Sequence, residues 1–164
     1  MGLIIGKSGI PMFKVGYPTV GDKYNVTGGT LAGTAAVNFG DLVKFSTTKG
    51  YFEAITGAVT LADIAGFVLA TNVKLATEFP GTDESIKVLP GEAFNLVLPG
   101  SYLAIALDST AVEDDVKANA QVYAIAATGK CTTVKGSNLA LPGVVFTGMV
   151  EKHGDTLVAE IYVK

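Results

Sequence analysis

The chain has 164 residues, of which 49% are hydrophobic and only 16% are charged. A chain of this length buries roughly 70% of the surface that it exposes when unfolded, and its low charge excludes disorder as the main state. All 12 cationic residues are lysines, and the formal net charge of −3 lacks the basic excess of nucleic-acid-binding proteins. No apolar run approaches the ~18 residues of a membrane-spanning helix. We therefore expect a soluble folded domain that binds neither nucleic acid nor a membrane.

Residues 1–23 differ from the rest of the chain, with five glycines and two prolines. This density prevents a helix and interrupts any strand ladder. Residues 2–8 approach the pattern of a phosphate-binding loop but are one residue short, so we expect no nucleotide. A flexible terminus and an arm that orders against a partner both stay open. In the second case the candidate contact residues are Ile10, Met12, Phe13, Lys14, Val15 and Tyr17.

From residue 24 onward, β-branched and aromatic residues occur in short runs separated by Gly, Pro, Asn and Asp. Only residues 109–120 have a helical pattern, so we expect at most one short helix. Runs spaced by roughly 8 to 20 residues are typical of a β-sandwich or a small β-barrel. The predicted strands are 42–46, 51–55, 64–70, 86–89, 93–98, 102–107, 121–126, 144–150 and 156–163. The fold class is therefore all-β, with an arm over 1–23 and a domain over 24–164.

The last two predicted strands form the clearest pair, because Gly154 between them suits the left-handed backbone of a hairpin turn. Other strands are apolar on both faces: Phe94, Leu96 and Leu98 share one face, and Val97 lies on the other. Such strands are covered on both sides by the same chain or by another subunit. In the second case the candidate self-association residues are Val97, Tyr102 and Tyr162.

Groups suited to catalysis are scarce. The chain has one cysteine, Cys131, and one histidine, His153, which excludes an internal disulfide and a His-rich metal site. His153 is expected to be exposed at the hairpin tip, and Cys131 to be a structural thiol without a second histidine to act as its base. The acids at 113–115 lack a surrounding calcium-binding loop and are expected in a solvated turn. We predict no catalytic residue, no metal and no cofactor.

Five short phrases follow one another in a distinctive order over residues 39–163. They are Phe-Gly-Asp-Leu-Val at 39–43, Ile-Ala-Gly-Phe-Val at 64–68, Pro-Gly-Glu at 90–92, the stretch 116–123 that ends in Val-Tyr, and Leu-Pro-Gly-Val-Val-Phe at 141–146. This order resembles the head decoration, or capsid cement, proteins of tailed bacteriophages. Asn119 stands where those proteins often have glycine, and Asn also tolerates that turn.

The resemblance implies a small β-barrel or β-sandwich that binds the outer surface of a mature phage head, often as a homotrimer, and bridges neighbouring major capsid subunits. It implies a virion location on the outside of the capsid and no active site. The major capsid protein is then the expected partner of the arm. A tail, baseplate or fibre module is the alternative, and a carbohydrate-binding sandwich is less favoured because the chain has no tryptophan.

Overall fold

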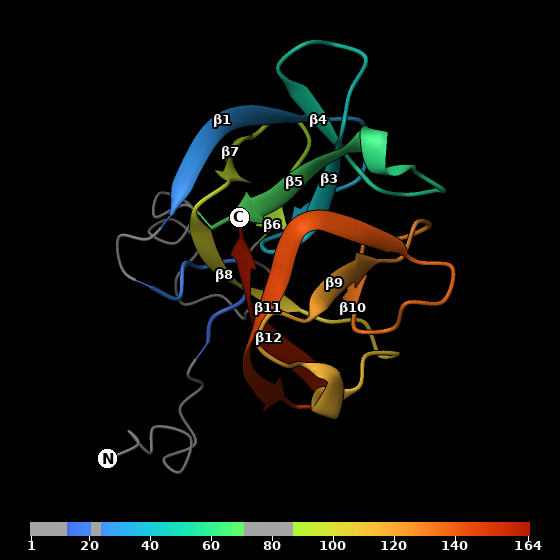
Figure 1. Ribbon diagram of the computed structural model, residues 1–164. Coiled ribbons are helices and arrows are strands. Elements are labelled where there is room, and N and C mark those ends of the chain that lie inside the picture. The colour runs from blue at the N-terminus through green and yellow to red at the C-terminus, as the bar shows by residue number, and fades with distance from the viewer. Residues whose placement is uncertain (1–12, 21–23, 71–86) are drawn as a thin grey trace.

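The computed structural model describes residues 13–20, 24–70 and 87–164, and these form an all-β protein, as predicted. Five strands close into a barrel, which occupies the upper half of the molecule in Figure 1. In order around the barrel, the strands are β1 (Asn25–Ala32), β4 (Tyr51–Ala54), β3 (Leu42–Phe45), β5 (Ile64–Leu69) and β7 (Ala93–Leu98). β1 and β4 run parallel, and the other neighbours run antiparallel.

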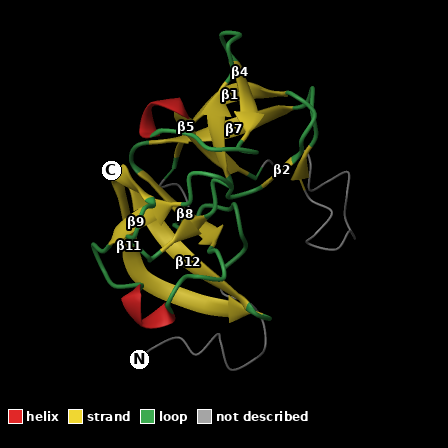
Figure 2. Ribbon diagram, turned by 90° about the vertical axis from the view of Figure 1, so that its right-hand side faces the viewer, coloured by secondary structure: helices red, strands yellow, loops and turns green. Residues whose placement is uncertain are grey.

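A five-stranded antiparallel sheet lies below the barrel in both Figure 1 and Figure 2. Its order is β10 (Cys131–Thr132), β9 (Gln121–Ala124), β11 (Leu139–His153), β12 (Thr156–Val163) and β8 (Ser101–Ala106). The predicted hairpin of β11 and β12 is confirmed, with Gly154 at a φ of 59° in the turn. Because β8 is last in this order, one of its two edges is left for another segment to cover.

The remaining regular elements are short. β2 (Val37–Asn38) pairs with β6 (Lys87–Val88), and the three-residue 3-10 turns are η2 (Leu61–Asp63) and η4 (Glu113–Asp115). No helix among the described residues is long and apolar enough to cross a membrane.

The helical pattern over 109–120 gives only η4. Asn119 has a φ of 64°, and its N–H donates to the carbonyl oxygen of Phe146 at 2.8 Å. The N–H of Phe146 donates in return to the carbonyl oxygen of Ala120 at 2.9 Å. This exchange of hydrogen bonds with β11 holds residues 117–120 in a turn, which the N–H of Ala120 closes by donating to the carbonyl oxygen of Lys117 at 2.9 Å, so a helix cannot continue. The left-handed Asn119 agrees with the turn expected there.

β1 is a strand that the sequence did not predict, and it contains the adjacent glycines Gly28 and Gly29. In the structure Gly29 lies beside the ring of Phe52, and a Cβ atom at Gly29 would be 2.3 Å from Cε2 of that ring. Only glycine leaves room for the aromatic side chain here. Gly29 therefore serves barrel packing, whereas a Cβ atom at Gly28 would meet nothing within 4 Å.

Two large apolar clusters make up most of the core, and a third, smaller one surrounds Phe13. One fills the barrel and includes Phe94 and Leu96. The other lies between the barrel and the sheet and joins Val97 to sheet residues such as Ile105 and Phe146. The predicted split of Phe94 and Leu96 from Val97 onto two faces is confirmed, and the chain itself covers all three, whereas Leu98 is 37% exposed.

Candidate functional site

Residues 16–19, which belong to the predicted arm, pair with the outer edge of β8. The N–H of Gly16 donates to the carbonyl oxygen of Ala104 at 2.8 Å, and the N–H of Ala104 donates to the carbonyl oxygen of Tyr17 at 3.1 Å. The N–H of Thr19 donates to the carbonyl oxygen of Tyr102 at 3.3 Å. This segment covers the backbone groups of the last strand, so it protects an otherwise open sheet edge.

Phe13 covers the face of the sheet that points away from the barrel. Its side chain is 6% exposed and packs with Ala104 and Val158, next to the partly buried Val15. Its backbone N–H donates to Oε1 of Glu151 at 2.6 Å. The chain therefore enters the described domain at a fixed point on β11.

Of the six candidate contact residues, the structure describes four. Phe13, Val15 and Tyr17 pack against the chain's own clusters, whereas Lys14 is exposed, with Nζ 4.9 Å from the centroid of the Tyr17 ring. Ile10 and Met12 lie outside the described residues. Contact with a partner stays a prediction for all six.

The junction between barrel and sheet brings together two glycines in the left-handed region. Gly16 has a φ of 80°, and a Cβ atom there would be 2.2 Å from Cβ of Phe39 and 2.7 Å from its carbonyl carbon. Gly40 has a φ of 84°, and a Cβ atom there would be 3.0 Å from Cγ1 of Val15. The carbonyl oxygen of Gly16 also accepts a hydrogen bond of 2.7 Å from the N–H of Ala70. The segment thus bridges barrel and sheet where no other residue type fits.

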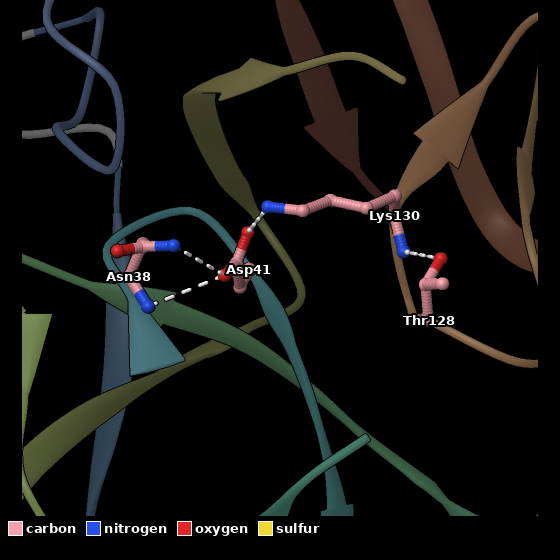
Figure 3. Close-up of polar contacts among 4 residues, drawn as sticks. All are labelled: Asn38, Asp41, Thr128 and Lys130. Carbon is pink, nitrogen blue, oxygen red and sulfur yellow. Dashed lines mark hydrogen bonds and ion pairs between the residues drawn. The ribbon is translucent and has the colours of Figure 1, made fainter. Parts of the chain in front are cut away.

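Asp41, the neighbour of Gly40, joins the two layers through its side chain (Figure 3). Oδ1 lies 2.7 Å from Nζ of Lys130, in the loop between β9 and β10. Oδ2 accepts hydrogen bonds from the backbone N–H and the side-chain Nδ2 of Asn38, at 3.2 and 3.1 Å. The Gly-Asp phrase of the sequence therefore helps to hold the barrel against the sheet.

The outer face of the sheet carries a row of four cross-strand partners on β8, β12, β11 and β9. They are Tyr102, Tyr162, Val145 and Gln121. All four are half-buried. The rings of Tyr102 and Tyr162 stack with centroids 4.5 Å apart and an interplanar angle of 27°. This row, which we call the tyrosine row, contains no charged residue.

Self-association was predicted for Val97 together with these two tyrosines. Val97 is 5% exposed and packs between the barrel and the sheet. Only Tyr102 and Tyr162 offer surface to a second copy, because the outward face of Val97 is already covered by the chain's own sheet.

The groups considered for chemistry are not arranged as a catalytic or metal site within the described residues. Burial is the main cause that raises the pKa of Cys131 far above its ordinary value, and the nearby charge of Asp41 adds to it. His153 is half-buried rather than exposed, because its Nε2 lies 2.6 Å from Oε1 of Glu151. The acids at 113–115 are exposed on η4, as expected. Within residues 13–20, 24–70 and 87–164, no three His, Cys, Asp or Glu side chains gather in a way that would hold a metal ion.

These features define a structural all-β protein whose specific polar contacts hold its own layers together. Residues 13–163 match the family model "Structural cement protein (E217 gp24/Pam3 gp6)". The chain therefore belongs to the phage structural cement family, and it is a capsid-associated structural protein located on the virion capsid.

Comparison with solved structures supports the fold. A chain from "The capsid of Myoviridae Phage XM1" superimposes with a TM-score of 0.63 at 18% sequence identity, covering 90% of this chain and 88% of that chain. No curated protein sequence matches the chain. The family match begins at Phe13, the residue at which the described chain first packs on the sheet.

Proposed function

We propose that the protein binds the outer surface of the mature phage head as a homotrimer and bridges neighbouring major capsid subunits. The observation that carries this proposal is the match of residues 13–163 to the structural cement family. Phe13, Val15 and Tyr17 anchor the segment on the sheet and barrel. Ile10, Met12 and Lys14 then supply the contact with the major capsid protein.

The proposal includes no catalytic step, no cofactor and no nucleic-acid or membrane partner. The buried thiol of Cys131 supports this, because a raised pKa keeps the sulfur protonated and unreactive. The contact of His153 Nε2 with Glu151 Oε1 supports it as well, because Glu151 also accepts the N–H of Phe13 and so helps to anchor the segment. The formal net charge of −3 disfavours binding to the phosphate backbone.

Two deletions separate the contact residues from the anchor. Purified protein lacking residues 1–12 or 1–23 is mixed with expanded heads that lack the cement protein, and the heads are sedimented. We expect the 1–12 deletion to keep the unfolding midpoint of the full chain and to lose saturable head binding. The 1–23 deletion also lowers the midpoint, because it uncovers the β8 edge and the partners of Phe13.

Full head binding by the 1–12 deletion would contradict the proposal that the arm contacts the major capsid protein. An unchanged midpoint for the 1–23 deletion would contradict the anchor.

A further inference from the structure

The apolar interior of the barrel continues to the molecular surface through three aromatic rings. Phe94 is 2% exposed, Phe52 is 8% exposed and Phe45 is 57% exposed. The ring centroids of Phe94 and Phe52 are 5.7 Å apart, and those of Phe52 and Phe45 are 6.0 Å apart. Phe45 on β3 is the cross-strand partner of Phe52 on β4, so both rings lie on the same face of this hairpin. Phe45 is therefore an exposed continuation of the barrel core.

Phe45 is the most exposed large apolar side chain within residues 13–20, 24–70 and 87–164. Single exposed apolar residues are normal on a protein surface. The ring of Phe45 differs from them because it packs beside the buried ring of Phe52, which restricts its rotamers before any partner binds. Covering such a side chain costs little additional conformational entropy, and aromatic residues of this kind are typical centres of protein–protein contacts.

The β3–β4 hairpin that carries Phe45 is held in shape by its own polar contacts. The N–H of Ser46 donates to the carbonyl oxygen of Tyr51 at 3.1 Å. Oγ of Ser46 donates to Oε1 of Glu53 at 2.9 Å, and Nζ of Lys44 lies 3.4 Å from Oε2 of the same carboxylate. The hairpin therefore presents Phe45 in a fixed position.

The tip of the hairpin, residues 46–50, carries one charged side chain. This is Lys49, which is exposed and forms no salt bridge to a described residue. Lys44 and Glu53, nearer the barrel, neutralise each other. The tip is therefore positive on a chain whose formal net charge is −3. A surface that complements Phe45 and Lys49 together is an apolar pocket bordered by carboxylates.

The hairpin and the N-terminal arm belong to different ends of the molecule. The β3–β4 hairpin is at the top of the barrel, above the sheet, in both Figure 1 and Figure 2. The anchor of the arm, Phe13, packs on the sheet face that points away from the barrel. A protein that bridges two subunits needs two separate contacts, and linking them in one chain strengthens binding beyond either contact alone.

We propose that the β3–β4 hairpin is a second contact with the major capsid protein, in which Phe45 enters an apolar pocket and Lys49 pairs with a carboxylate at its rim. The inference rests on the proposed function and names the surface that reaches the neighbouring capsid subunit. Membership of the structural cement family supports the capsid as the occupant, because it makes the protein capsid-associated. The positive, pre-ordered tip supplies the chemistry of the contact.

Two variants test the apolar and the charged part of this contact. Purified protein is mixed with expanded heads that lack it, and the bound fraction is measured by sedimentation over a range of concentrations. We expect Phe45→Ala to weaken binding roughly tenfold or more. Lys49→Glu should weaken it by about threefold, and only at low ionic strength. Both side chains are exposed, so the unfolding midpoints should stay close to that of the wild-type protein.

Matched variants outside the hairpin serve as controls. Met149→Ala shortens an apolar side chain on β11 that is 43% exposed. Lys135→Glu makes the same charge change as Lys49→Glu at an exposed lysine between β10 and β11. We expect both controls to bind heads like the wild-type protein. Equal weakening by the hairpin variants and their controls would reduce the effect to general surface properties and overturn the contact.

A photoreactive side chain at the same position identifies the occupant. Protein with Phe45→p-benzoylphenylalanine is bound to heads and illuminated, and mass spectrometry identifies the peptides joined to it. We expect a peptide of the major capsid protein. A peptide from a second copy of this chain, or no product, would overturn the contact. If the wild-type protein fails to bind heads, the proposed function fails together with the contact. If it binds and Phe45→Ala binds equally well, only the hairpin contact is contradicted.

Discussion

At the junction between barrel and sheet, the carboxylate of Asp41 accepts two hydrogen bonds from Asn38 and pairs with Lys130. On the outer face of the sheet, the stacked rings of Tyr102 and Tyr162 are only half-buried. The junction is complete within one chain. The outer face is covered at Phe13 and is open at the tyrosine row.

This difference separates two kinds of sequence signal. The Gly-Asp phrase that carries much of the family resemblance lies at the junction, where Gly40 faces Val15 and Gly16. Tyr102 and Tyr162 belong to no such phrase, although Val145 and Gln121 of the same row belong to two of them. The Gly-Asp phrase therefore maintains the fold, and the two tyrosines predicted for contact between copies lie outside the phrases.

The largest loss of stability at the junction is expected when a side chain is introduced at Gly16. Gly16→Ala places a Cβ atom 2.2 Å from Cβ of Phe39, and we expect the free energy of unfolding to fall by roughly 3 kcal/mol or more. Gly50→Ala is the matched control, since Gly50 has a φ of 83° but nothing within 4 Å, and it should cost only about 1 kcal/mol. Urea unfolding measures both. Equal losses would show that Gly16 serves backbone conformation alone.

Removing the ring of Phe13 tests how firmly the segment is held. Phe13→Ala leaves a cavity against Ala104 and Val158, and the expected loss of unfolding free energy is about 3 kcal/mol. Trypsin should also cut faster after Lys14. Val20→Ala in the same segment, at 39% exposure, should change stability by less than about 0.5 kcal/mol. A Phe13 variant as stable as the Val20 variant would argue against the anchor.

The ion pair of the junction makes a smaller contribution. Lys130→Met removes the contact to Asp41, in which the two side chains are 37% and 22% exposed. Solvent screening limits the expected loss to about 1 kcal/mol. Lys152→Met removes the more exposed pair with Glu113 and should cost less than about 0.5 kcal/mol. Labelling of the buried Cys131 by a thiol reagent should speed up only in the Lys130 variant. Equal labelling rates in the Lys130 and Lys152 variants would show that the Lys130–Asp41 pair does not hold the barrel against the sheet.

The smallest effect concerns a carboxyl group on the barrel surface. A hydrogen bond from Ser46 is the first cause that lowers the pKa of Glu53, and Lys44 lowers it further. Ionised Glu53 therefore stabilises the fold above the ordinary pKa of 4.5, and this contribution is lost as the pH falls through the lower folded value. Ser46→Ala should raise the pKa of Glu53 in an NMR titration. The pKa of Asp63, lowered by hydrogen bonds from Thr60, should not move.

Most of the strand pattern was predictable because alternation and turn residues are local. The strand Thr156–Val163 and the turn at Gly154 could be predicted from the residues next to them in the sequence. β1 was missed because Gly29 makes room for Phe52, a contact between strands that no local rule contains. Of the short helix expected within 109–120, only the three residues of η4 form, because hydrogen bonds to Phe146 hold the end of the segment in a turn.

The surfaces were less predictable. The arm was chosen for its glycines and prolines, yet Gly16 turns out to fit a close approach to Phe39 and residues 16–19 pair with β8. Alternation along β12 put Val158, Glu160 and Tyr162 on one face but did not indicate that the first two are buried. Val158 packs with Phe13, more than a hundred residues away in sequence, so periodicity along one strand carries no information about its burial.

The most direct test of the cement assignment is to add the purified protein to expanded heads of its own phage that lack it and to image them by cryo-electron microscopy. The account predicts saturable density on the outer capsid surface, in register with the lattice and spanning neighbouring major capsid subunits. The same heads should release their DNA at a higher temperature than undecorated heads. Bare heads, with the protein found instead on tails or fibres, would contradict the account.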